Sequence, residues 1–266
     1  MHVIAVEKVA ALERANYLAL QPWVQSLPGA SVSVRHDVIT TRAALFPTPD
    51  LNHACLLRTT PVEVERLVDA IVAPLKRGRR KIHIFVSPAC TPADLGERLL
   101  ARGFEKEESE EPWLRFDLRG WVPPPVGSDA VRVIRAGPGD ARIFARVYLM
   151  SFGMTAALAP LVAPIMKRLM RVPSTRYALA SVDGQPAGVC VWHSHGDTAA
   201  LGGMGVLPSF RGSRVATTLG MQVMLDAQAE GKTTIIAQMV NPGFEGFVAQ
   251  YGFERVFTRT HYVLPC

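Results

Sequence analysis

Hydrophobic and polar positions repeat with a helical period most clearly in the second half of the chain. Leu219, Val223 and Leu225 fall on one side of a helix that the pattern predicts over residues 215–229. An apolar strand ending at Val206 precedes this helix, and Pro208 opens the turn between them. We take this strand–turn–helix segment as the one around which the rest of the chain is organised.

The same patterning predicts further elements on both sides of that segment. Before it we expect a strand from residue 131, a helix over 140–152 and an apolar helical continuation over 153–172. Two hairpin strands follow at 176–182 and 187–193, joined at the turn Asp183-Gly184. After the segment we expect a strand over 233–240, a break at 241–243, and a short helix that ends near Gly252.

The first half shows a comparable alternation of helices and strands. Helices are predicted over residues 3–23, over 61–76 and from 91 through 100; strands are predicted at 32–34, 42–46, 53–57, 82–86 and 113–118. Three consecutive prolines at 123–125 favour an extended spacer. We therefore predict a first domain at 1–120, a proline-rich linker at 121–129 and a second domain at 130–266.

Composition and charge narrow the class of protein. The 266 residues are 48% hydrophobic and 20% charged, which is typical of a globular protein rather than a disordered one. The formal charge of +6 favours anionic ligands. The basic run at 76–81 is interpreted as the cationic end of a helix rather than as a nucleic-acid patch. We expect no specific nucleic-acid partner.

No segment predicts a membrane or metal role. The longest apolar run, at 154–166, is too short to span a bilayer and contains Pro160 and Pro164. The first residues lack the pattern of a signal peptide. The four cysteines, which lie far apart without metal-ligand spacing, are Cys55, Cys90, Cys190 and Cys266. We interpret them as reduced thiols and expect a cytoplasmic protein without a metal.

The turn after the apolar strand has the chemistry of an anion site. Arg211, Gly212 and Ser213 present consecutive backbone N–H groups where a helix begins, and the positive end of the helix dipole adds to them. Gly203 and Gly205 leave room for a ligand to lie close along the strand. An extended ligand with a diphosphate in its middle, such as coenzyme A, suits this arrangement.

These residues resemble the acyl-CoA-binding motif of the GNAT superfamily of N-acetyltransferases, Gln/Arg-x-x-Gly-x-Gly/Ala. Arg211 takes the first position and Ala216 the last, while Arg214 replaces the central glycine. Downstream, Asn241 and the Gly252-Phe253 pair resemble the segment that closes the other side of the coenzyme in that family. The resemblance covers about residues 131–264 in the family's order of elements.

The resemblance implies a fold and a co-substrate. We expect an α+β (mixed α/β) protein of two GNAT-like domains, each a central, mostly antiparallel sheet flanked by helices. The first domain is expected to be degenerate, because it lacks the coenzyme loop. The co-substrate is expected to be acetyl-CoA, and the residues implied to bind it are Met204, Gly205, Val206, Arg211, Gly212, Ser213, Arg214, Val215, Ala216, Thr217 and Asn241.

The catalytic residues are less defined. The family often places a proton-donating tyrosine seven residues after the asparagine, and Val248 stands there in this chain. Tyr251 is a weak substitute, and His193, His195 and Asp197 are weak candidates for a base.

Three readings of the function remain open at this point. The first is acetyl transfer to a primary amine in a ternary complex, and the second is a non-catalytic acyl-CoA sensor or interaction module. The third, transfer of a longer acyl group, is the least favoured. The expected partner is a small-molecule or peptide amine, and the basic surface favours a neutral or anionic one. A homodimer is left open.

Overall fold

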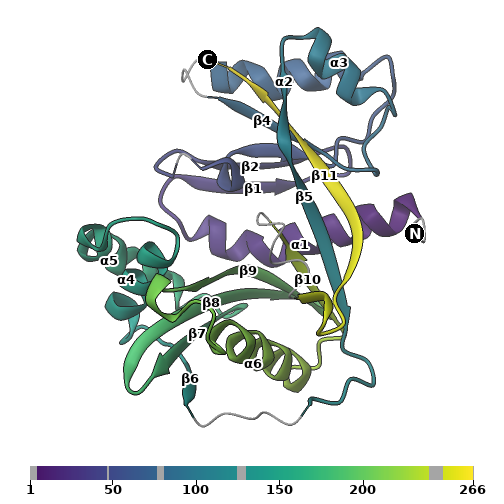
Figure 1. The fold of residues 1–266 in the computed structure, drawn as a ribbon. Helices are drawn as coiled ribbons and strands as arrows, with labels where there is room; N and C mark the ends of the chain where they lie inside the picture. Colours follow the sequence, from purple (N-terminus) through teal and green to yellow (C-terminus); the bar gives the residue numbers. More distant parts are fainter. Residues whose placement is uncertain (1–4, 47, 77–80, 125–129, 240–247, 266) are drawn as a thin grey trace. The chain divides into compact units, whose positions relative to one another are not determined.

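The computed structural model describes residues 5–46, 48–76, 81–124, 130–239 and 248–265 (Figure 1). The chain forms two compact units: unit 1 comprises Met1–Arg115 and Ala237–Cys266, and unit 2 comprises Phe116–Ile236. The chain therefore passes from one unit to the other within the strands β5 (Glu105–Asp117) and β10 (Thr234–Gln238). None of the helices in the described residues combines the length and the apolar character that a membrane span requires.

Unit 1 contains a mostly antiparallel sheet in the strand order β1-β2-β3-β4-β11-β5. Its other strands are β1 (Ala30–Val34), β2 (Ile39–Ala43), β3 (His53–Cys55), β4 (Ile82–Val86) and β11 (Glu254–Leu264). Its helices are α1 (Val6–Gln25), α2 (Val64–Lys76) and α3 (Leu95–Ala101), with a short 3-10 turn η1 at Pro49–Leu51. Only the β3–β4 pair is parallel within this unit's described strands, since α2 carries the chain across between them.

The core of unit 1 follows from the apolar faces of α2 and α3. Val68 and Ile71 on α2 and Leu99 on α3 are buried together against the strand residue Ile84. The i, i+3, i+4 spacing of these apolar residues gives each helix one apolar stripe, which must be buried against the sheet.

Unit 2 has a sheet in the order β10-β9-β8-β7-β6. Its strands are β6 (Val131–Arg135), β7 (Thr175–Val182), β8 (Gln185–His195) and β9 (Thr198–Val206), together with β10. Its helices are α4 (Ala141–Ser151), α5 (Ala159–Leu169) and α6 (Val215–Ala229), with short 3-10 turns η2 at Ala156–Leu158 and η3 at Pro208–Phe210. The neighbouring pairs are antiparallel except β9–β10, which α6 connects as a parallel crossover.

Local sequence explains most of the boundaries in unit 2. Asp183 and Gly184 both have positive φ, 50° and 77°, as the tight hairpin between β7 and β8 requires. Gly153, with φ of 75°, ends α4. The predicted continuation over 153–172 is therefore a separate helix rather than an extension of α4. Thr155 begins the new turn, because its hydroxyl accepts a hydrogen bond from the Ala157 N–H at 3.3 Å.

The predicted fold class is confirmed, since both units have mostly antiparallel sheets flanked by helices. The helix predicted over 215–229 and the strand predicted over 82–86 have the observed bounds. The strand predicted at 113–118 is incomplete, because β5 begins at Glu105. Its first half is a charged run that pairs with β11, as in Glu111↔Arg259.

The two compact units divide the chain at Arg115 and Ala237, whereas the predicted domains meet at residues 121–129. β11 belongs to unit 1, where its backbone pairs with β4 and with β5 on its two sides. β11 thus completes the sheet of the first unit, although the sequence placed it in the second domain. Residues 125–129 of the predicted linker lie outside the described residues.

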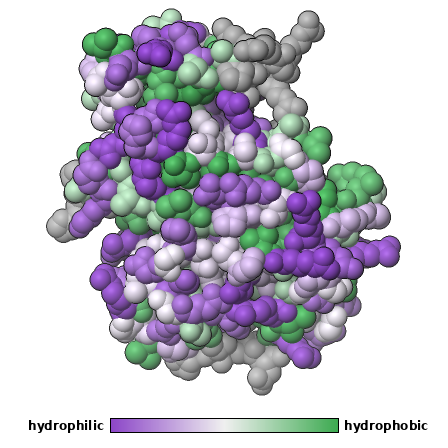
Figure 2. Space-filling model, turned by 180° about the vertical axis from the view of Figure 1, so that it is seen from behind, coloured by the Kyte–Doolittle hydropathy of each residue, from purple (hydrophilic) through white to green (hydrophobic). Residues whose placement is uncertain are grey.

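On the face of the molecule seen in Figure 2, hydrophobic residues (green) lie among hydrophilic ones (purple). Isolated exposed apolar side chains are ordinary on protein surfaces. Exposed apolar residues are therefore informative only where several come from one segment, as they do between α4 and α5 of unit 2.

Candidate functional site

The candidate site lies at the C-terminal end of β9, where this strand has one open edge. On one side β9 pairs with β8 along its length, from His195↔Thr198 to Gly188↔Val206. On the other side, within the described residues of unit 2, the ladder with β10 covers only positions 198–200. Residues 201–206 therefore extend past the ladder, with backbone groups available to a ligand.

The hydrogen bonds of β9 identify which N–H groups face the open edge. The Leu207 N–H donates to the Ala187 carbonyl beside β8 at 2.9 Å. Because N–H directions alternate along an extended strand, the Met204 and Val206 N–H groups point to the opposite, open edge. A ligand that lies along this edge can accept hydrogen bonds from both, as an added strand would.

The glycines of β9 make room for protein as well as for a ligand. A Cβ at Gly205 would lie 2.5 Å from the Ser151 Cβ, and one at Gly202 would lie 2.4 Å from the His193 Nε2. These glycines thus let α4 and the His193 ring pack directly on the strand. Gly202 is also the extra residue of a β-bulge, since Val191 pairs with Gly203 and Trp192 with Leu201.

The loop that follows β9 is held in place by Arg211. Its Nη2 donates to the Ser151 carbonyl at 3.2 Å and its Nε to the Val206 carbonyl at 3.4 Å. Gly212 has φ of 76° and no neighbour within 4 Å of a built Cβ. The loop is therefore anchored to the end of α4, while its glycine turns in open space just before α6.

The start of α6 concentrates positive charge. Its first turn, Val215-Ala216-Thr217, contains no acidic residue, and Arg214 stands at its N-cap position. A cation at this end opposes the helix dipole by about 0.3–1 kcal/mol, whereas an anionic ligand would be stabilised there. Arg214 has φ of −78°, so the residue that replaces the motif glycine adopts an ordinary conformation without strain.

His193 lies in the interior of unit 2 rather than on its surface. Its side chain is 1% exposed, and its Nδ1 is 3.0 Å from the Thr175 hydroxyl. Burial lowers the pKa of the His193 imidazole to about 3. The ring is therefore neutral at pH 7 and too weakly basic to take a proton efficiently from an amine.

His195 and Asp197 lie at the opposite end of β9 from the open edge. Asp197 accepts hydrogen bonds from Thr233 at its carbonyl, 2.8 Å, and at its carboxylate, 3.0 Å, and so fixes the start of β10. At about 3.3 Å per residue, roughly 25 Å of strand separates Asp197 from Gly205. This position favours a structural role in the turn.

The remaining predicted residues belong to unit 1 or fall outside the description. Asn241 lies outside the described residues. Tyr251 lies in unit 1, one turn after Val248, whose carbonyl accepts the Tyr251 N–H at 3.0 Å. Gly252 ends this turn with φ of 91°, as predicted for a helix C-terminus. The roles assigned to Asn241 and Tyr251 stay predictions. Among the described residues, His, Cys, Asp and Glu side chains form no group suited to a metal.

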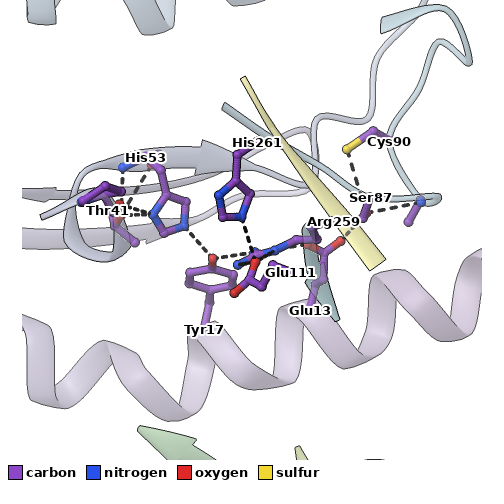
Figure 3. A network of polar contacts seen from close by, with 11 residues as sticks. Glu13, Tyr17, Thr41, His53, Ser87, Cys90, Glu111, Arg259 and His261 are labelled. Atoms are coloured by element: carbon purple, nitrogen blue, oxygen red, sulfur yellow. Dashed lines mark hydrogen bonds and ion pairs between the residues drawn. The ribbon is translucent and has the colours of Figure 1, made fainter. Parts of the chain in front are cut away.

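A buried polar network in unit 1 was missed by the sequence analysis (Figure 3). Arg259 of β11 is 1% exposed; its Nε donates to Glu111 Oε2 at 2.6 Å and its Nη1 to the Tyr17 hydroxyl at 2.8 Å. Its guanidinium carbon lies 4.7 Å from the Trp113 ring centroid. The Glu13 carboxylate is 3.5 Å away. The partners are far apart in sequence, and no local pattern marks them.

Charge balance explains the state of each group in this network. The Arg259 guanidinium and the His261 ring hold the pKa of Glu111 down, at about 2, against the opposing effect of burial. The Tyr17 hydroxyl accepts a hydrogen bond from Arg259 and therefore donates its own hydrogen bond to His53 Nε2, at 2.5 Å. His53 Nδ1 then carries a proton for the Pro49 carbonyl at 2.9 Å, and burial lowers its pKa to about 3.

Comparisons with known proteins agree with this geometry. Residues 150–253 match the family model described as the acetyltransferase (GNAT) family. This range includes β9, its open edge and the whole of α6. A search of the curated proteins finds no match.

Several solved structures share the fold of the whole chain. A GCN5-related N-acetyltransferase from Kribbella flavida superposes with a TM-score of 0.71 at 17% identity, covering 100% of this chain and 97% of that one. A tandem GNAT protein from the clavulanic acid biosynthesis pathway gives 0.63 at 14% identity, covering 98% and 96%. A GCN5-related N-acetyltransferase from Sphaerobacter thermophilus gives 0.61 at 13%, covering 98% and 94%. At these identities the likeness concerns the fold.

Proposed function

Because residues 150–253 match the family model of the GNAT acetyltransferases, we propose that this protein is an acetyl-CoA-dependent N-acetyltransferase. The acetyl group passes to a primary amine by direct attack in a ternary complex. One observation supports this most: the open edge of β9 leads directly into a positively charged helix start that lacks an acidic residue.

The residues at this edge fit coenzyme A. The Met204 and Val206 N–H groups face the open edge of β9, along which the amide-containing arm of the coenzyme can lie extended. Gly212 and the first turn of α6 fit its diphosphate through backbone N–H groups and the helix dipole. Arg214 adds a cation for the same phosphates.

Acetyl transfer at this edge requires few protein groups. The thioester supplied by acetyl-CoA lies beside the amine, and holding the two together gives most of the rate advantage. The amine nitrogen bonds to the carbonyl carbon, and a β9 N–H near Met204 stabilises the oxygen as it gains charge. The C–S bond then breaks and the amine loses its proton to solvent. A thiol with a pKa near that of cysteine, about 8.5, can leave without an acid.

Two glycines with the same conformation provide a matched test of the coenzyme site. Gly212 and Gly184 have φ of 76° and 77°, and neither has a neighbour within 4 Å of a built Cβ. Gly212→Asp and Gly184→Asp therefore introduce equal strain and equal charge. We expect Gly212→Asp to weaken acetyl-CoA binding, measured by calorimetry, at least about tenfold, because the carboxylate repels the diphosphate.

The Gly184→Asp variant should bind within about twofold of the unchanged protein, since Gly184 lies in the β7–β8 hairpin and not in the loop that begins α6. Equal affinities in both variants would place the coenzyme elsewhere. Acetyl transfer is then measured as free thiol released with a panel of amines.

A non-catalytic acyl-CoA sensor is the second candidate. It is favoured by Val248 in place of the usual tyrosine and by the weakly basic, buried His193. Tight acetyl-CoA binding without thiol release across the amine panel would support the sensor. Release with any amine would exclude it.

A further inference from the structure

The two faces of β9 are covered by different helices. Successive strand residues point to opposite faces, so Gly205 faces α4 and Val206 faces away from it. Gly188 pairs with Val206, and a Cβ there would lie 2.7 Å from Val215 Cγ1 of α6. The anion-binding loop therefore belongs to the α6 face. The α4 face is left for the group that attacks the acyl carbon.

Two aromatic rings stand on the α4 face beside the end of β9. The Tyr148 hydroxyl is 3.8 Å from the Cβ position of Gly203, and Phe152 Cε2 is 3.2 Å from that of Gly205. The two ring centroids are 4.8 Å apart. Together they form an aromatic wall, with ring planes 46° apart, beside the backbone that would bind the thioester.

The wall continues into the corner between α4 and α5. Four apolar side chains in this short stretch are exposed: Phe152 by 48%, Met154 by 42%, Leu158 by 40% and Leu161 by 72%. An exposed apolar cluster of this kind on a soluble domain marks a binding surface. Its continuity with the rings beside β9 indicates that the surface serves the same reaction.

The charge around this corner excludes one class of amine. Between Asp140 and Asp183 the chain has no acidic residue, while the basic residues are Arg142, Arg146, Lys167, Arg168 and Arg171, together with Arg176, which is ion-paired with Glu230. Polyamines and lysine-rich peptides carry extra positive charges that need carboxylates nearby. This segment repels them instead.

We propose that the acceptor is a monoamine with an apolar, aromatic body, and that residues 148–161 select it over polyamines and lysine-rich peptides. The proposal rests on acetyl transfer at the open edge of β9. The aromatic body packs against Tyr148 and Phe152, and the amine points toward the acyl carbon beside Gly203.

The test compares 2-phenylethylamine with spermidine as acceptors for the full chain, with acetyl-CoA binding measured in parallel. We expect kcat/KM for 2-phenylethylamine to exceed that for spermidine by at least about tenfold. Phe152→Ala should lower kcat/KM for 2-phenylethylamine about tenfold with the KM for acetyl-CoA unchanged, and Phe152→Leu should restore most of it.

A charge variant tests the selection directly. Leu158→Asp places a carboxylate at the corner and should shift the preference toward spermidine about tenfold. Val62→Asp, on an 88% exposed position of unit 1, adds the same charge elsewhere and should leave the preference unchanged.

The possible failures are distinguishable. A preference of the unchanged protein for spermidine, or no shift in Leu158→Asp, overturns the acceptor inference while acetyl transfer stands. Acetyl-CoA binding with no thiol release from any amine overturns the proposed transfer, and the acceptor inference with it.

Discussion

Each unit, in its described residues, contains one pair of parallel strands joined by a helix. The two connections differ in the residues that follow the first strand of each pair. In unit 1, β3 is joined to β4 through α2; in unit 2, β9 is joined to β10 through α6. Both ladders have three registered pairs. The two units differ in the segment just after the paired residues of β3 and of β9.

In unit 1 the chain fills the position itself. The Thr91 N–H donates to the Leu57 carbonyl at 2.8 Å, and the Thr91 hydroxyl bonds Thr59 on both its N–H and its carbonyl at 3.0 Å. The turn that leads into α2 is also closed by protein groups. The Thr60 hydroxyl donates to the Glu63 carboxylate at 2.9 Å and accepts from the Glu63 N–H at 3.3 Å. These groups, which could otherwise bind a phosphate, are therefore hydrogen-bonded within the protein.

In unit 2 the corresponding strand end and helix start carry basic residues instead. Residues 201–206 extend past the ladder, and Arg211 and Arg214 flank the first turn of α6. The comparison shows that the residues after the first strand differ between the two crossovers: Thr-Pro-x-Glu in unit 1 and Arg-Gly-Ser-Arg in unit 2, where we propose the coenzyme site.

The largest expected effect comes from making the same substitution, arginine to alanine, in each unit. Arg259→Ala leaves Glu111 buried without its cation and should lower the free energy of unfolding by about 3–5 kcal/mol. Arg211→Ala removes hydrogen bonds to two carbonyls near the surface and should cost no more than about 1 kcal/mol. Urea unfolding measures both.

Acetyl-CoA titration completes this pair of variants, because Arg211→Ala should lose affinity. A large decrease in the free energy of unfolding of Arg211→Ala would show that Arg211 also stabilises the fold of unit 2. A loss below about 1 kcal/mol in Arg259→Ala, the range of exposed ion pairs, would show that the unit 1 network is dispensable.

Acid should destabilise both units because each contains a buried histidine with a lowered pKa. The folded pKa values of His53 and His193 are about 3, below the unfolded value near 6.5. The unfolded chain therefore binds protons first, and stability falls as the pH drops below about 6.5. Between pH 7 and pH 5 we expect a loss of about 2 kcal/mol per histidine.

Urea unfolding at both pH values tests this expectation, with His53→Gln and His193→Gln each removing about half of the pH dependence. Glu111, with a pKa of about 2, contributes only at lower pH. An unchanged dependence in one variant would mean that its histidine already titrates in the folded state.

The smallest expected effect comes from changing the charge at the N-terminus of α6. Thr217→Glu places an acidic residue in the first turn of α6, as Glu65 does in α2. We expect acetyl-CoA affinity to fall about tenfold while helix stability rises by up to about 1 kcal/mol, because the carboxylate satisfies the dipole in place of the phosphate.

Calorimetry and thermal unfolding measure these opposite changes. Thr217→Gln, which keeps the size without the charge, is the control and should lose little affinity. A parallel fall of stability and affinity would indicate disruption of α6 rather than competition with the ligand.

Local signals were enough to predict much of unit 2. The apolar period and Pro208 predicted α6 with its observed bounds, and Asp183-Gly184 predicted the hairpin, because each depends on residues close in the chain. The loop from Arg211 to Ala216 was likewise found from its own residues. The open edge of β9 beside it was not, since it depends on where β10 stops pairing.

Tertiary structure decided the rest, for reasons that lie outside any local pattern. The run 105–112 looks too charged for a strand, yet Glu111 is buried because Arg259, 148 residues later, lies opposite it. β11 joined unit 1 because two strands there offered backbone partners. The sequence by itself determined most of the elements and the turn between β9 and α6. Burial and pairing between distant residues decided which charges are interior, which glycines receive a neighbour and which strand edge stays open.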